Sequence, residues 1–153
     1  MSDAAVTATR TITVRRHYQA PPARVFAAWT TPEMVDAWWG PAGFTTRVHT
    51  LEARPGGRFH FEMTAPTGTA SHTSGVYVEV DPPRRLVFEI TDHCTADMPE
   101  EQQQPDPARV IVEFIATATG TALTLTHENL SAGFAGLAEP AWAQGLEKLA
   151  AVL

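Results

Sequence analysis

The sequence predicts a single α+β domain in which a curved antiparallel sheet is covered by one long C-terminal helix. Six segments with strand character follow one another between residues 44 and 129, joined mostly by short links rich in proline and glycine. Apolar residues at helical spacing then close the chain over residues 139–153. Because 153 residues suffice for one core, we assign residues 10–153 to one domain and residues 1–9 to a flexible tail.

The N-terminal part predicts one strand and two short helices. Alternating apolar residues indicate a strand over residues 10–19. Pro22 stands where a first helical turn tolerates its missing N–H, so a short helix is expected to follow. Thr31 and Pro32 are typical of the cap and first residue of a second short helix, which ends at Gly40.

The middle of the chain predicts a meander of strands, at residues 44–53, 58–64, 71–80, 85–93, 109–117 and 122–129. Gly75 is a potential bulge that would reverse the facing of the residues after it. One link is long: residues 94–108 hold three prolines and no apolar face, which predicts a mobile loop. Two roles stay open for it, a lid over a cavity or a solvated hairpin tip.

The C-terminal helix has Pro140 near its predicted start and Trp142, Leu146, Leu149 and Leu153 on one face. A sheet wrapped around one helix, with its end covered only by short helices, tends to leave an interior space. We therefore expect a cavity for a small apolar molecule.

Composition and charge exclude several functions. A net charge of −6 with scattered basic residues argues against nucleic-acid binding. A single cysteine excludes an internal disulfide, and no apolar run is long enough for a signal peptide or a membrane span, so we expect a cytoplasmic protein without membrane insertion. Glycine-rich phosphate cradles and a nucleophile elbow are missing, so no cofactor and no covalent catalysis are expected.

Five segments, taken together and in order, resemble the bacterial homologues of the activator of the heat-shock-chaperone ATPase. This family lies in the START-like superfamily, which also includes the birch-pollen allergen and aromatic polyketide cyclases. The segments are residues 20–30, 38–41, 54–59, 75–80 and 120–127.

The resemblance implies the helix-grip fold: a seven-stranded antiparallel sheet wrapped around a long C-terminal helix, with two short helices after the first strand and a hydrophobic cavity. It does not fix one function, because this fold serves carriers, cyclases and interaction domains. One departure concerns the cavity. Family members commonly carry Gly-Trp in the last helix, and here the pair is Gly145-Leu146, so the size of the cavity depends on whether Trp142 fills the space.

Ligand-lining residues are predicted from the inward face of the strands and from the aromatic residues of the helices. The set is Trp38, Trp39, Phe44, Phe59, Phe61, Tyr77, His127 and Trp142. For the adjacent tryptophans two arrangements stay open: an aromatic gate to the cavity, or one ring in the core and the other on the surface.

His127 and Glu79 are the candidates for proton transfer. His127 shares its facing with Leu123 and Leu125, which places an imidazole in the interior, either as a satisfied core group or as a base. Glu79 shares its facing with Tyr77, so its carboxylate is also expected inside, with a ligand or an arginine such as Arg47 or Arg58 as partner.

A metal site is not expected. Five histidines (His49, His60, His72, His93 and His127) lie on or beside strands, but none has a compact metal-ligand spacing. His60 and Glu62 are predicted to form a solvated pair on the outer face.

The functions that follow from these patterns differ in class. The first is binding of a small hydrophobic, aromatic or lipid-like ligand without catalysis. The alternatives are a cyclase or dehydratase that uses His127 or Glu79, and a chaperone-associated interaction module. Both a monomer and a homodimer are compatible with the sequence.

Overall fold

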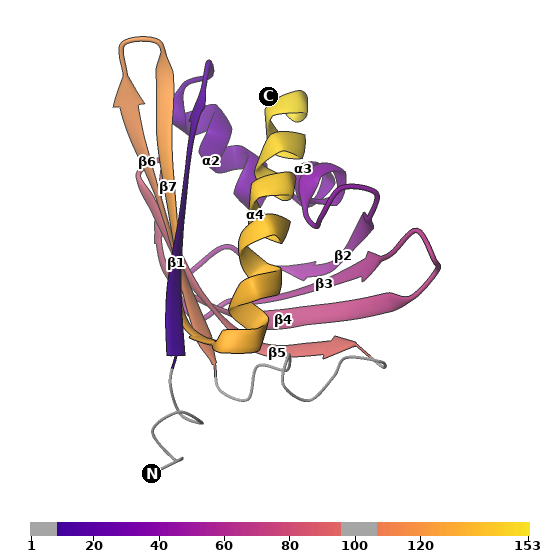
Figure 1. Ribbon diagram of the computed structural model, residues 1–153. Helices are drawn as coiled ribbons and strands as arrows, with labels where there is room; N and C mark the ends of the chain where they lie inside the picture. The colour runs from indigo at the N-terminus through magenta and orange to yellow at the C-terminus, as the bar shows by residue number, and fades with distance from the viewer. Residues whose placement is uncertain (1–8, 96–106) are drawn as a thin grey trace.

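A computed structural model describes residues 9–95 and 107–153. Seven strands and three helices follow the predicted order (Figure 1). Their bounds are β1 Thr9–Tyr18, α2 Pro22–Thr30, α3 Pro32–Trp38, β2 Thr45–Leu51, β3 Arg58–Thr64, β4 Ala70–Asp81, β5 Arg85–Thr95, β6 Ala108–Thr117, β7 Gly120–Ser131 and α4 Ala132–Val152. All strand and helix predictions match an element of the correct type. The predicted tail lies outside the described residues except for Thr9, which begins β1.

The seven strands form one antiparallel sheet in the order β1-β7-β6-β5-β4-β3-β2. Strands β2 to β7 form a meander, because each pairs with its successor in sequence. The first strand, β1, pairs with β7 instead and occupies the edge opposite β2. The helices α2 and α3 connect these two edges, so the chain crosses one end of the sheet between them (Figure 1).

The helix α4 lies against the concave side of the sheet, as Figure 1 shows, and the predicted helix-grip fold is confirmed. Its predicted start was wrong. The helix begins at Ala132, where the Ser131 side chain accepts a hydrogen bond from the Phe134 backbone N–H at 3.2 Å, and Pro140 lies inside it. A side-chain cap and the packing of Phe134 thus outweigh the hydrogen bond that proline cannot make.

The buried face of α4 fixes the helix to the sheet. Leu146 and Leu149 are fully buried, and the Tyr18 hydroxyl of β1 donates a hydrogen bond of 2.8 Å to the Leu146 backbone oxygen. Burial raises the pKa of Tyr18, so the phenol stays protonated and remains a donor.

Two irregularities divide β4. Its pairing with β5 shifts between Ser74 and Gly75 and again between Tyr77 and Glu79. The predicted irregularity at Gly75 is confirmed, but the expected reversal of facing there was wrong, because Ser71, Thr73, Gly75 and Tyr77 are all buried and the extra residue lies on β5. The second shift has its extra residue on β4 and does change the facing after Tyr77. The core includes residues from all three helices and from six of the seven strands, and β2 contributes partly buried side chains.

No helix in the part of the chain that the structure describes is long and apolar enough to cross a bilayer.

Candidate functional site

A cavity of about 350 Å³ lies between α4 and the central strands. The helix contributes Phe134, Leu137, Ala138, Ala141, Trp142 and Gly145, and the end of α3 with the following loop contributes Trp38, Trp39, Gly40, Pro41 and Phe44. The sheet side is formed by Met63, Ala65, Thr69, Ser71, Thr73, Ile90, His93 and His127. This volume is in the range of sites for small organic ligands.

Five of the eight predicted lining residues border this cavity: Trp38, Trp39, Phe44, His127 and Trp142. They come from α3, the loop after it, β7 and α4, so the fold brings together residues that are far apart in sequence. Whether these residues bind a ligand is not tested by their position, and that part stays a prediction.

The other three, Phe59, Phe61 and Tyr77, do not border the cavity. They face inward as predicted, but they pack with Trp29, Trp39, Leu86 and Phe88 around a space of only about 10 Å³. The rings of Phe59 and Phe88 lie 5.4 Å apart, and those of Phe59 and Tyr77 lie 5.5 Å apart. Aromatic packing therefore fills this part of the concave face, and placing these three rings at the cavity was wrong.

Both adjacent tryptophans are buried, so the alternative with one ring on the surface is wrong. The Trp38 indole N–H donates a hydrogen bond of 2.8 Å to the Ala28 backbone oxygen in α2. The Trp39 ring packs at 5.2 Å from Trp142, and Trp142 in turn stacks at 5.9 Å on Trp29. Trp142 thus supplies an indole one turn before Leu146, and a sizeable cavity still remains beside it.

His127 is the best-buried polar group at the site, with an exposed fraction of 2%. Its facing was predicted correctly. The Trp142 indole N–H donates a hydrogen bond of 3.0 Å to His127 Nδ1. Burial lowers the pKa of His127 to about 4, because the charged imidazolium would lose its hydration. The ring is therefore neutral at neutral pH.

This hydrogen bond fixes the tautomer of His127. An indole nitrogen only donates, so His127 Nδ1 must accept and cannot carry a hydrogen. In the neutral ring the hydrogen is then on Nε2, which has no hydrogen-bond partner among the described residues. His127 Nε2 thus carries the hydrogen but is itself buried, and the only ring lone pair that could take up a proton already accepts the Trp142 hydrogen bond.

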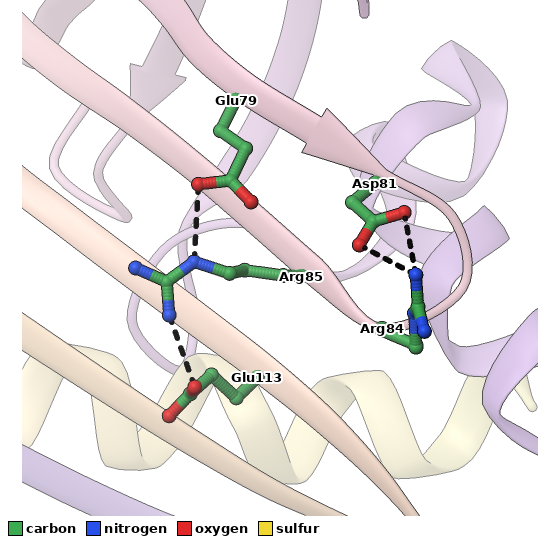
Figure 2. A network of polar contacts seen from close by, with 5 residues as sticks. All are labelled: Glu79, Asp81, Arg84, Arg85 and Glu113. Carbon is green, nitrogen blue, oxygen red and sulfur yellow. Dashed lines mark hydrogen bonds and ion pairs between the residues drawn. The ribbon is translucent and has the colours of Figure 1, made fainter.

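Glu79 does not lie at the site. Its side chain is 46% exposed and accepts a hydrogen bond of 3.2 Å from Arg85, which also contacts Glu113 at 3.0 Å (Figure 2). The irregularity between Tyr77 and Glu79 reverses the facing after Tyr77, which is why the inward prediction was wrong. The partner is an arginine, but it is Arg85 and not Arg47 or Arg58, and the pair lies on the outer side of the sheet, away from α4 (Figure 2).

Four polar residues of the cavity were missed as ligand-lining residues: Thr69, Ser71, Thr73 and His93. The His93 Nδ1 and Thr73 hydroxyl lie 2.8 Å apart, and burial lowers the pKa of His93. The inward facing of Ser71 and Thr73 could have been predicted from the sequence, because both occupy the inward positions of an alternating strand.

The loop that forms one wall of the cavity is held by α4. The Lys148 ammonium donates to the backbone oxygens of Gly40, Pro41 and Phe44, each at 3.2 Å. One turn earlier, the Gln144 side-chain oxygen accepts a hydrogen bond of 3.0 Å from the Ala42 N–H. Partial burial lowers the pKa of Lys148, because the ammonium group loses part of its hydration. The three carbonyl oxygens replace the water that it loses.

Replacing Lys148 by methionine is expected to lower the free energy of unfolding by about 2 kcal/mol, because hydrogen bonds to a charged donor contribute about 1.5–3 kcal/mol. The measurement is urea denaturation at neutral pH. The control is Glu147→Gln, an exposed neighbour on the same helix, which should change stability by less than about 0.5 kcal/mol. Equal stabilities for both variants would contradict a holding role for Lys148.

Three histidines gather on the outer face of β2, β3 and β4. His60 Nε2 and His72 Nδ1 lie 2.9 Å apart, and the His49 and His60 rings stack at 4.8 Å. Glu62 pairs with His49 at 2.8 Å, which corrects the predicted His60–Glu62 pair. Within residues 9–95 and 107–153 no group of three histidine, cysteine or acidic side chains has a geometry that could hold a metal ion.

Comparison with known proteins supplies a family model, that of "Activator of Hsp90 ATPase homolog 1-like protein", which matches residues 19–153. No curated protein matches significantly. A crystal structure of a protein from Chromobacterium violaceum has 26% identity and a TM-score of 0.79, with 93% of this chain and 95% of that chain covered. The AHSA1 protein from Silicibacter pomeroyi has 23% identity and a TM-score of 0.75, with 94% and 96% covered. A protein from Mycobacterium smegmatis has 23% identity and a TM-score of 0.77, with 95% and 91% covered.

Proposed function

This chain belongs to the family of Activator of Hsp90 ATPase homolog 1-like proteins, and from that premise we propose that it binds a small uncharged molecule, apolar or aromatic, in the cavity beside α4. The cavity itself is the observation that carries the proposal. Its volume of about 350 Å³ is large for a packing defect and suits a ligand of two or three fused rings.

The lining argues for an uncharged ligand. None of the side chains that border the cavity, among the described residues, is Asp, Glu, Lys or Arg. Burial holds the pKa values of His93 and His127 below the ordinary value, so both rings are neutral at neutral pH. A charged ligand would lose its hydration without a counter-charge, which costs several kcal/mol. An apolar ligand gains about 25 cal/mol for each Å² removed from water.

Filling the cavity should weaken binding at least tenfold without unfolding the protein. Ala141 borders the cavity on α4, so Ala141→Phe places a ring in the space that a ligand would use. We expect fluorene to bind the wild type with a Kd on the order of 10 µM, and to bind Ala141→Phe at least tenfold more weakly. Quenching of tryptophan fluorescence measures both, because three indoles border the cavity.

The matched control is Ala150→Phe, an exposed position on the same helix outside the cavity. This variant should bind fluorene as the wild type does. Absence of fluorene binding by the wild type, or equal affinities for wild type and Ala141→Phe, would contradict the proposed site.

The two other candidate functions, an enzyme and a chaperone-associated module, have weaker support. Neither residue predicted for proton transfer in a cyclase or dehydratase is free to act there, because Glu79 lies on the outer face and the His127 lone pair accepts the Trp142 hydrogen bond. The chaperone-associated role and the oligomeric state stay predictions from the sequence.

A further inference from the structure

A second cluster of groups that can bind a ligand lies on the outer face of the sheet, where His49, His60 and His72 gather on β2, β3 and β4. Both chain neighbours of His60 and both of His72 are buried on the concave side, so these two imidazoles are directed to the opposite side of the sheet. Both are only partly buried, and solvent therefore reaches them. None of the three histidines borders the cavity.

Strand pairing brings these imidazoles together. His72 on β4 is the cross-strand partner of Glu62, which follows His60 by two residues on β3, so His60 and His72 are diagonal neighbours on one face. His49 is the extra residue at an irregularity of β2, and its ring stacks at 4.8 Å on that of His60. Three strands thus bring histidines to one point of the outer face.

The separation of two ring nitrogens fits a metal ion. His60 Nε2 and His72 Nδ1 lie 2.9 Å apart in a hydrogen bond. Two imidazole nitrogens bound at right angles to one ion at about 2.0 Å lie about 2.8 Å apart, whereas tetrahedral ligands at that distance lie about 3.3 Å apart. The pair therefore has the spacing of neighbouring ligands in a square-planar or octahedral complex.

We propose that His60 and His72 bind a divalent transition-metal ion that prefers right-angle coordination, nickel(II) or copper(II), with water in the other positions. The ion takes the place of the hydrogen in the N–H···N contact. That hydrogen moves through solvent to the other nitrogen of its own ring, so both imidazoles stay neutral and no proton is lost overall. Two protein ligands suffice, which agrees with the lack of a three-residue metal group among the described residues.

The charges around the pair favour a cation. Glu62 and Asp92 both act on His60 with negative charge, whereas one positive side chain, Arg47, acts on Glu62. Glu62 also accepts a hydrogen bond of 2.8 Å from His49 when His49 Nε2 carries the hydrogen, which holds the carboxylate beside the cluster.

This site departs from the sequence-based expectation of no metal site. That expectation considered ligand spacing along the chain, whereas His60 and His72 are brought together by the pairing of β3 with β4. The site is also independent of the proposed binding function, because it lies on the other side of the sheet.

Calorimetric titration with nickel(II) at pH 7.5, in a buffer that does not bind metals, tests the site. Nickel(II) is the probe because, unlike copper(II), it does not oxidise the cysteine of the chain. The wild type should bind one ion with a Kd on the order of 10 µM, and His60→Gln and His72→Gln should each bind it at least tenfold more weakly. A wild-type Kd above about 1 mM, or equal affinities for the wild type and both variants, would overturn the proposal.

Two further histidine variants serve as controls. His17→Gln, on β1 and away from the cluster, should keep the wild-type affinity. His49→Gln keeps both proposed ligands and should change the Kd by less than about threefold. A loss in His49→Gln as large as that in His60→Gln would overturn the two-ligand geometry.

Proton NMR of the wild type keeps the test independent of how the variants fold. Nickel(II) with water among its ligands is paramagnetic, so a small fraction of one equivalent should broaden the imidazole signals of His60 and His72 before those of His17 and His127. Broadening of His17 first, or of all histidines together, would overturn the assignment.

Discussion

Replacing Gly75 by alanine is expected to destabilise the protein by about 3 kcal/mol. A Cβ atom at this position would lie 1.8 Å from the Glu89 backbone oxygen and 2.8 Å from the Phe59 ring. Both neighbours are fixed, the first in β5 and the second in the aromatic core. The sheet must therefore open locally between β4 and β5, at the first of the two irregularities.

The matched control is Gly136→Ala on α4, where an added Cβ has no neighbour within 4 Å. That change should raise stability by up to about 1 kcal/mol, because alanine favours a helix more than glycine does. Urea denaturation of both variants provides the comparison. A Gly75→Ala protein within about 1 kcal/mol of the wild type would show that the β4–β5 contact adapts more easily than its geometry implies.

Acidification is expected to remove about 2.5 kcal/mol of stability between pH 7.5 and 4.5 through His127 alone. Its pKa is about 4 in the folded protein and 6.5 when exposed, so over this range the unfolded chain takes up the proton more readily. The stabilisation that the neutral His127 ring contributes is fully present above pH 6.5, the pKa in the unfolded chain. It is lost as the pH falls from there towards the folded-state pKa of about 4. The depressed pKa of His93 acts in the same direction.

The test compares pH dependence, because replacing His127 also changes stability at neutral pH. His127→Phe should show a loss between pH 7.5 and 4.5 that is smaller than the wild-type loss by about 2.5 kcal/mol. His17→Gln, at an exposed histidine on β1, is the control and should keep the wild-type loss. The same pH profile for wild type and His127→Phe would mean that the imidazole is not neutral in the folded state.

Local patterns predicted the elements well because turns and facing are properties of neighbouring residues. The inward facing of His127 followed from simple alternation along β7, which has no irregularity in its pairing with β6. Glu79 was placed wrongly because its facing depends on a shift against β5, and that shift is set by a partner strand. The start of α4 was misplaced because Pro140 was taken as a first-turn residue, whereas the cap is Ser131.

Alternation shows which side of a sheet a residue faces, but not whether that place holds a cavity or packed side chains. Phe59 and His127 both face inward, yet only His127 borders the cavity. What separates them is where α4 and the loop at residues 40–44 lie over the sheet, and Lys148 helps to fix that loop. These are contacts between distant segments. The Trp142–His127 hydrogen bond belongs to the same class, which is why the tautomer could not be predicted from the sequence.

The position of β1 has a consequence for how the chain folds as it is made. Its partners on β7 lie more than a hundred residues later, so β1 leaves the ribosome long before it can pair. At synthesis rates of about 5–20 residues per second, that interval is on the order of 5–20 seconds. The meander from β2 to β6 can form in the order of its emergence, whereas the nascent β1 has to be kept from pairing elsewhere until the last strand emerges.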